Sequence, residues 1–161
     1  MRTTSLIALL IATVIAAAAA EPAIGVTAPD LGSTSTLNTK DGAGVNLTGL
    51  RGKVVVVDFW ATWCGPCVEA IPHMQTLHDT YRDKGLVVIG HTDGSSRDLP
   101  AFITEKKITY VISVGKDIGG AYGDPEIPHV FVIDPAGKVA WHGHPAQLTD
   151  AVIEEQLKGV R

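Results

Sequence analysis

The hydrophobic pattern of the chain centres on one uninterrupted apolar run. Residues 54–57 are four consecutive valines, with no alternation between apolar and polar positions. Such a run is typical of a strand that is buried on both faces in the middle of a sheet. A helical pattern follows, with apolar positions at helical spacing from Val68 to Tyr81 and Gly85 where a helix would end. Pro72 lies inside this segment, and we expect it to kink the helix.

Further strands and helices are predicted on both sides of this strand–helix unit. The predicted segments are an extended lead-in at 21–30, a hairpin at 37–47, a turn or short helical piece at 48–53, strands at 54–59, 86–90, 110–114, 130–133 and 138–142, and helices from 64 to about 84 and at 98–107, 116–122 and 147–158. The Asp41-Gly42 pair supplies the turn of the hairpin. Because strands alternate with helices before a final hairpin and helix, we expect an α/β sandwich with a mixed sheet.

A C-x-x-C motif stands where the central strand gives way to the helix. Its cysteines, Cys64 and Cys67, are the two cysteines of the chain, and Gly65 and Pro66 lie between them. This spacing brings both sulfurs into one turn, where they can be bridged. The unpaired N–H groups and the helix dipole of the first turn favour the thiolate of Cys64, which we expect to be the attacking sulfur. Pro66 suits this turn because its missing N–H would have no partner there.

A structural disulfide and half of a zinc site are the alternative interpretations of the motif. A structural zinc site needs four ligands, and the chain contains no second C-x-x-C. A purely structural bridge across so short a loop would remove little entropy from the unfolded chain. The spacing therefore favours a redox-active pair.

The length and charge of the chain restrict the remaining possibilities. The 161 residues suit one domain, and the net charge of −4 without any Lys/Arg run gives no indication of nucleic-acid binding. Arg2 is followed by an apolar stretch and by five alanines at 16–20. This pattern predicts a cleaved signal peptide at 1–20, a domain at 21–161 and export to the periplasm, with an uncleaved membrane anchor as the alternative.

Residues 59–67, FWATWCGPC, resemble the active-site segment of the thioredoxin superfamily. The longer run from Ala28-Pro29-Asp30 through Gly52-Lys53 to Cys67 resembles the extracytoplasmic TlpA/ResA-like (redoxin) branch, and the resemblance covers nearly all of the chain after residue 24. It implies a thioredoxin-like α/β fold, in which helices flank a mixed central sheet that carries an N-terminal hairpin extension. It also implies that the helix and strand predicted at 98–114 are a central insertion.

The same resemblance gives Asp58 a role. This residue lies six positions before Cys64 in a strand that we expect to be buried, so its carboxyl pKa should be raised. Thioredoxins have Asp at this position, which favours a proton acceptor and donor for Cys67. A carboxylate that is hydrogen-bonded to the backbone or near solvent is the alternative.

The expected substrate-binding residues surround the two cysteines. Ile127-Pro128 corresponds to the cis-proline segment that, in a thioredoxin fold, faces the C-x-x-C and docks an extended substrate chain. His129 follows, where family members often have Thr, so we expect it near the sulfurs, tuning their pKa or the substrate choice. Trp63, Gly65 and Pro66 complete the expected docking surface, although the tryptophan could serve packing alone.

No metal and no dissociable cofactor is expected beyond the redox-active Cys64–Cys67 disulfide. The chain has six histidines, of which His142 and His144 are two apart on a strand-like stretch and would share a face. A copper or zinc site made of Cys and His is the alternative. We do not favour it, because no ligand spacing recurs.

The leading functional hypothesis is a monomeric periplasmic thiol–disulfide oxidoreductase that reduces protein disulfides. Its partners would be disulfide-bonded or thiol-containing proteins, and a membrane thiol carrier such as a DsbD/CcdA-like protein would re-reduce it. The resembled branch serves cytochrome c maturation and other protein-reducing tasks. Because Gly65-Pro66 is the dipeptide of thioredoxin, we expect a reducing couple on the order of −250 mV.

Two other functions stay open. The N-terminal region also resembles peroxiredoxins, which would make the chain a thiol peroxidase, although their Pro-x-x-x-Thr/Ser-x-x-Cys arrangement is missing around Cys64. A copper-binding chaperone that uses the cysteines and a histidine is the third hypothesis. The Gly-Pro pair between the cysteines and the lack of a downstream ligand pattern argue against it.

Overall fold

The computed structural model describes residues 20–95, 98–116 and 120–160. The predicted signal peptide at 1–20 therefore lies outside the described residues, apart from Ala20. Within the described ranges, no helix combines the length and the hydropathy needed to cross a bilayer.

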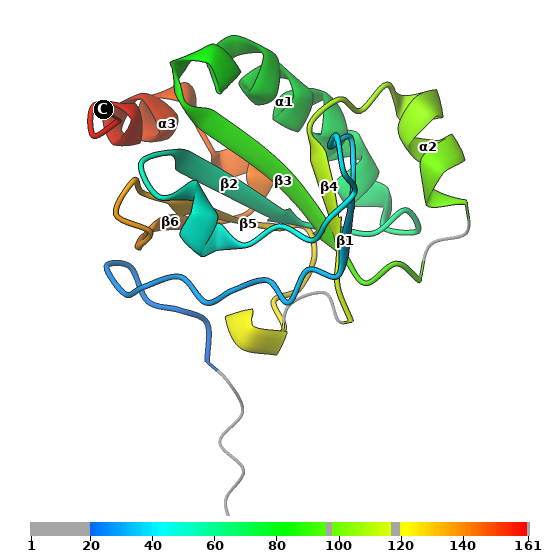
Figure 1. Cartoon of the computed structure of the whole chain (residues 1–161), viewed down its shortest axis with the longest axis horizontal. Helices are drawn as coiled ribbons and strands as arrows, with labels where there is room; N and C mark the ends of the chain where they lie inside the picture. The colour runs from blue at the N-terminus through cyan, green and yellow to red at the C-terminus, as the bar shows by residue number, and fades with distance from the viewer. Residues whose placement is uncertain (1–19, 96–97, 117–119, 161) are drawn as a thin grey trace, which may run out of the picture.

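The described residues form one mixed six-stranded sheet, with the strand order β1-β4-β3-β2-β5-β6 (Figure 1). The strands are β1 (Ser35–Leu37), β2 (Val54–Phe59), β3 (Leu86–Thr92), β4 (Val111–Val114), β5 (His129–Ile133) and β6 (Val139–Gly143). β2, β3 and β4 are parallel to one another, whereas β1, β5 and β6 each pair antiparallel with a neighbour. β2 lies between β3 and β5 and is buried along its whole length, as the valine run predicts.

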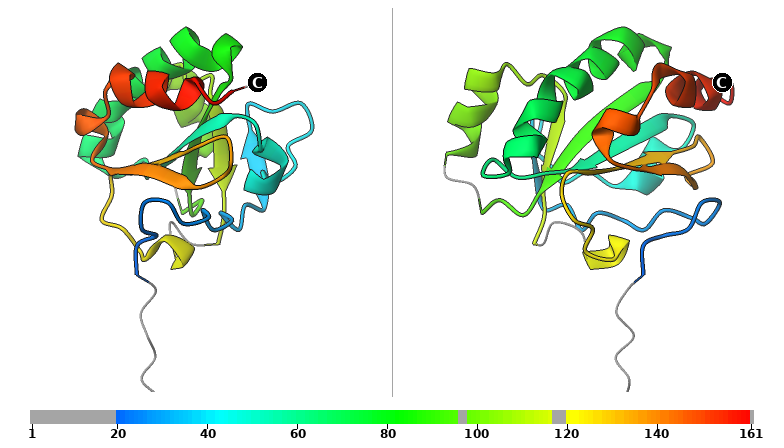
Figure 2. Two further views of the ribbon diagram at one scale, coloured as in Figure 1. Left: turned by 90° about the vertical axis from the view of Figure 1, so that its left-hand side faces the viewer. Right: turned by 180° about the vertical axis from the view of Figure 1, so that it is seen from behind.

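The two faces of the sheet are covered differently. The helices α1 (Gly65–Tyr81), α2 (Leu99–Lys106) and α3 (Asp150–Leu157) lie on one side (Figures 1 and 2). The N-terminal segment and the short 3-10 helices η1 (Leu47–Leu50) and η3 (Gly120–Tyr122) lie on the other. These layers confirm the predicted α/β sandwich.

The sheet separates two hydrophobic cores, and β2 contributes to both. Because side chains alternate along a strand, its residues divide between the faces. Val54 and Val56 pack into the core beneath the helices, and Val55, Val57 and Phe59 pack into the opposite core. The same alternation directs Asp58 to the helix side, at the end of the strand where α1 begins.

The predicted hairpin at 37–47 is wrong in its extent. The strand is Ser35–Leu37 and pairs with β4, while its return limb makes one isolated bridge, between Ser35 and Ala43. The Thr36 N–H donates to the Gly42 carbonyl at 3.0 Å and the Thr36 hydroxyl donates to the Ala43 carbonyl at 2.7 Å, so the limbs are joined by a few bonds around the turn and not by a regular ladder. β1 is the edge strand of the sheet and pairs antiparallel with β4 instead, and residues 47–50 form η1.

The helix boundaries follow local signals in most places. α1 continues through Pro72 and passes into η2 (Arg82–Lys84), and Gly85 ends it with a φ of 101°. The predicted closing helix at 147–158 begins later, at Asp150, because the 3-10 turn η4 (Pro145–Gln147) precedes it. Of the helix predicted at 116–122, residues 117–119 lie outside the described residues, and the remainder includes η3.

Candidate active site

Cys64 occupies the N-cap of α1, and residues 60–63 connect it to the end of the buried strand β2. Its backbone is extended, with φ −85° and ψ 102°, and its sulfur accepts a hydrogen bond from the Cys67 N–H at 3.3 Å. Pro66 lies in the first turn, where its missing N–H has no consequence. The C-x-x-C motif therefore lies at the strand–helix junction that the sequence predicts.

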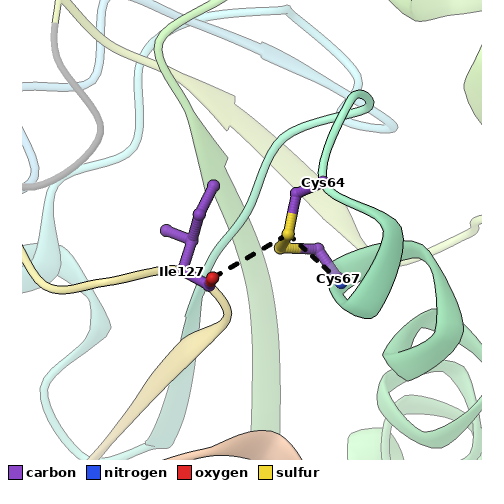
Figure 3. The surroundings of a disulfide bond; sticks show 3 residues. All are labelled: Cys64, Cys67 and Ile127. Carbon is purple, nitrogen blue, oxygen red and sulfur yellow. Dashed lines mark hydrogen bonds between the residues drawn. A yellow bond between two sulfur atoms is a disulfide. The ribbon is translucent and has the colours of Figure 1, made fainter.

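Cys64 and Cys67 form a disulfide (Figure 3), with their Cα atoms 5.2 Å apart. The two sulfurs differ in accessibility, because Cys64 is 6% exposed and Cys67 only 1%. Cys67 lies on the inner face of α1, in the same core as Ile71 and Met74. A partner molecule can therefore reach Cys64 more readily than Cys67.

The segment before β5 lies opposite the disulfide. The Ile127 carbonyl oxygen is 3.9 Å from the Cys64 sulfur (Figure 3), and the Ile127–Pro128 peptide bond is cis. Pro128 is buried and Ile127 is half-buried. A backbone acceptor thus faces the more accessible sulfur.

The surface around the disulfide is open on the side of the motif. Trp63 is 67% exposed, and Gly65 and Pro66 are exposed as well. Trp60, three residues earlier, is only 1% exposed and packs in the helix-side core. Trp60 is therefore a core residue, whereas Trp63 presents an apolar ring beside Cys64.

Asp58 is a buried carboxyl group with an incomplete set of partners. The residue is 2% exposed, and its Oδ1 atom has no hydrogen-bond partner among the described residues. Burial raises the pKa of Asp58 from 3.8 to about 7, because the charged form loses its hydration. The carboxyl group is therefore able to exchange a proton near neutral pH.

Tyr110 and Trp60 share this buried region, and no local sequence pattern links Tyr110 to the site. Its hydroxyl and the Trp60 Nε1 are both buried without a partner among the described residues. Burial raises the pKa of Tyr110, and the charge of Asp58 raises it further. An aromatic residue before a short apolar strand is typical of a hydrophobic core and does not by itself indicate an active site. Tyr110 could be placed near Asp58 only by predicting the parallel pairing of β3 with β4, which brings this tyrosine beside Gly90.

The His129 ring lies on the sheet face away from α1, as Phe131 does two residues later. Within the described residues, its polar and ring contacts are with Glu21, Phe131 and His142, and none is with a cysteine. Partial burial lowers the pKa of His129, and the Glu21 carboxylate opposes that effect. The backbone of His129 adjoins the segment facing Cys64, but its ring belongs to a separate cluster.

Comparisons with known proteins agree with this geometry. The profile of the AhpC/TSA family matches residues 24–142. The thiol-disulfide oxidoreductases ResA of Bacillus thuringiensis (strain Al Hakam) and Bacillus anthracis are each 32% identical over 123 residues, covering 74% of this chain and 68% of theirs. The crystal structure of a candidate thiol:disulfide interchange protein DsbE from Chlorobium tepidum is 28% identical, with a TM-score of 0.72, and the match covers 88% of this chain and 100% of that one.

A second solved structure is the thioredoxin domain of a thiol-disulfide oxidoreductase from Bacteroides vulgatus. It is 28% identical with a TM-score of 0.69, covering 86% of this chain and 99% of that domain. The sheet order, the C-x-x-C at the start of α1 and these neighbours define a thioredoxin-like fold. The chain belongs to the AhpC/TSA family and, within the thioredoxin superfamily, to the TlpA/ResA-like thiol–disulfide oxidoreductases.

Proposed function

We propose that this protein reduces protein disulfides outside the cytoplasm, with Cys64 and Cys67 as its redox pair. One observation carries the proposal: Cys64 caps α1, is the more exposed of the two sulfurs and faces the Ile127 carbonyl. A thiolate needs access and stabilisation to act as a nucleophile. Cys64 has both.

The reaction consists of two thiol–disulfide exchanges. The Cys64 thiolate attacks one sulfur of a substrate disulfide, a mixed disulfide forms, and the other substrate sulfur leaves as a thiolate and takes up a proton. Cys67 then loses its proton and attacks the Cys64 sulfur. The substrate is released as a dithiol, two electrons have passed to it, and the Cys64–Cys67 disulfide remains.

The first turn of α1 stabilises the attacking thiolate. The Cys67 N–H already donates to the Cys64 sulfur at 3.3 Å in the oxidised protein. Hydrogen bonds to an ionised acceptor are about twice as strong as neutral ones, and the helix dipole acts in the same direction. The pKa of Cys64 should therefore be lower in the reduced protein than that of Cys67.

Asp58 is proposed to accept the proton of Cys67 during the second exchange. Both residues are buried on the α1 side of β2, one at the strand's end and the other in the first turn of the helix. A general base works best when its pKa is close to the operating pH. The pKa of about 7 that burial produces at Asp58 meets this requirement.

An extended segment of the substrate is proposed to dock across the disulfide. Ile127 and Pro128 would pair with it through backbone groups, as an added strand pairs with a sheet edge. Trp63, Gly65 and Pro66 would form the opposite wall, supported by their exposure beside Cys64.

The proposed setting is the periplasm, reached after removal of residues 1–20. Disulfides are the default state in such a compartment, so a reductant there needs its own electron supply. A membrane thiol carrier of the DsbD/CcdA type would fill that role, and the protein would act as a monomer. Disulfide-bonded proteins, including those of cytochrome c maturation, are the proposed substrates.

Trapping with a Cys67→Ser variant tests the proposal. Without a resolving thiol, the mixed disulfide on Cys64 should accumulate as bands that disappear on reduction. The matched Cys64→Ser variant should trap none. Equal trapping by both variants, or by neither, would contradict the assigned roles.

A thiol peroxidase is the second candidate, favoured by the AhpC/TSA family match. It would require Cys64 to attack hydrogen peroxide, with Cys67 resolving the sulfenic acid and releasing water. Peroxide consumption by the reduced protein decides between the two. We expect it to be far slower than reduction of a protein disulfide, and the reverse ranking would favour the peroxidase.

A further inference from the structure

Three polar side chains from separate parts of the chain converge on the sheet face away from α1. They are Glu21 in the N-terminal segment, His129 at the start of β5 and His142 in β6. One ligand atom from each can be chosen so that all three lie within 4.8 Å of one another. This His-His-Glu cluster is separate from the disulfide, since its polar contacts are made among its own members.

The spacing within the His-His-Glu cluster suits a tetrahedral metal ion. His129 Nε2 lies 3.3 Å from His142 Nδ1. Two ligand atoms on a tetrahedral zinc with bonds of about 2.1 Å lie about 3.4 Å apart. A Glu21 carboxylate oxygen is 3.7 Å from His142 Nδ1, so a small side-chain rotation brings it to the same spacing.

Both imidazoles are held in place by their surroundings. Their rings stack at an interplanar angle of 20°, and the His142 ring stacks on Phe131 at 17°. The two histidines stand on β5 and β6, which are hydrogen-bonded neighbours. Their side chains are 15% and 27% exposed, so they are fixed yet reachable from solvent.

The third ligand is tethered to the same sheet edge. The Gly25 N–H donates to the Val139 carbonyl at 2.7 Å, and the Val139 N–H donates to the Val26 carbonyl at 2.9 Å. These bonds hold the N-terminal segment against β6, four residues after Glu21. The carboxylate remains 40% exposed, which leaves it free to adjust around an ion.

We propose that Glu21, His129 and His142 bind one divalent transition-metal ion, with zinc as the best-fitting ion. Two imidazoles and one carboxylate are a common donor set for zinc, and three protein ligands leave a fourth position for water or another ligand. The cluster differs from the copper site considered from the sequence, because no cysteine takes part. The proposal also departs from the sequence-based expectation that the protein binds no metal. That expectation relied on local ligand spacing, and residues 21, 129 and 142 are too far apart in the sequence to form a spacing motif.

Calorimetric titration with zinc chloride tests this site. The protein is used oxidised, so that neither sulfur can ligate, and is purified without a histidine tag. We expect saturable binding of one zinc per chain in the micromolar range or tighter, together with a rise in melting temperature. His142→Ala and Glu21→Gln should each weaken binding about tenfold or more.

His144→Ala is the matched control, because this histidine lies two residues after His142 and its Nδ1 instead accepts from the Ala146 N–H. It should keep the affinity of the unchanged protein. Glu21→Gln replaces a half-exposed side chain, so its result does not depend on core packing. The proposal is overturned if zinc does not saturate the protein below millimolar concentration, or if Glu21→Gln and His142→Ala bind as tightly as His144→Ala.

Discussion

Asp58 is paired with Gly90 across the parallel β2–β3 ladder, so no side chain on β3 stands beside the buried carboxyl group. The space is taken by the Trp60 indole, whose Nε1 would lie 2.8 Å from a Cβ placed on Gly90. Tyr110 and Ile112 close the same space, at 3.2 and 3.0 Å from that position. The environment that raises the pKa of Asp58 therefore depends on a missing side chain on the neighbouring strand.

Gly90→Ala should destabilise the protein by about 1–3 kcal/mol, because an added methyl group overpacks a filled core. The free energy of unfolding from denaturant titration measures this cost. Gly49→Ala is the control, since a Cβ there meets nothing within 4 Å. Equal stability of the Gly90→Ala variant and the unchanged protein would mean that the Trp60 indole has room to move.

Asp58→Asn should stabilise the oxidised protein at neutral pH. Ionising the buried carboxyl group opposes folding, and a pKa raised from 3.8 to about 7 corresponds to at most about 4 kcal/mol. Well below pH 3.8 the carboxyl group is protonated in both states, and the penalty vanishes. It grows as pH rises from 4 to 7, since the unfolded chain releases its proton first, and is constant above pH 7.

Urea titrations of both proteins at several pH values measure this difference. The advantage of Asp58→Asn should be small at pH 4 and reach its plateau near pH 7. Asp83→Asn, which changes an exposed carboxylate, should show no such rise. If the difference in unfolding free energy between Asp58→Asn and the unchanged protein did not depend on pH, burial would not raise the pKa of Asp58 as described.

The same variant should slow resolution of the mixed disulfide. The proposed base acts when ionised, so the rate for the unchanged protein should rise with pH through about 7. Asp58→Asn should be slower by about tenfold or more at pH 7, with the gap closing toward pH 9 as Cys67 ionises unaided. The release of thionitrobenzoate from a Cys64 adduct, measured by absorbance, reports the rate of this step. If the rates of the two proteins had the same pH profile, Asp58 would have a structural role only.

Trp63→Ala should weaken docking of protein substrates without loss of stability. Its ring is 67% exposed, so its removal should change the free energy of unfolding by less than about 0.5 kcal/mol. The KM for protein disulfides such as those of insulin should rise several-fold, whereas reaction with a small aromatic disulfide should be unchanged. If activity with the protein substrate and with the small disulfide fell equally, Trp63 would affect the reactivity of Cys64 and not substrate docking.

Local signals were sufficient for the parts of the fold that positioned the cysteines. The valine run predicted the central strand, the C-x-x-C predicted the strand–helix junction, and Gly85 predicted the end of the helix. Each signal lies within a few residues of the structure it specifies. The extent of the hairpin at 37–47 was wrong because β1 forms its ladder with β4, which lies some 75 residues further along the chain.

The surroundings of the site were also harder to predict, because they are formed by residues that lie far apart in the sequence. Tyr110 reaches the Asp58 region only through the pairing of β3 with β4. Glu21 meets His142 only because the N-terminal segment runs along β6. The ring of His129 was expected near the sulfurs, yet strand alternation turns it to the other face of the sheet.

The reduction potential of the Cys64–Cys67 couple tests the central claim, that this protein is a reductant, most directly. The Gly65-Pro66 dipeptide adds no charge that would stabilise the Cys64 thiolate, and a carboxylate at Asp58 would oppose it. Equilibration with glutathione buffers, read by thiol alkylation and mass spectrometry, should give a potential on the order of −250 mV. A value near about −120 mV would mark an oxidant and contradict the account.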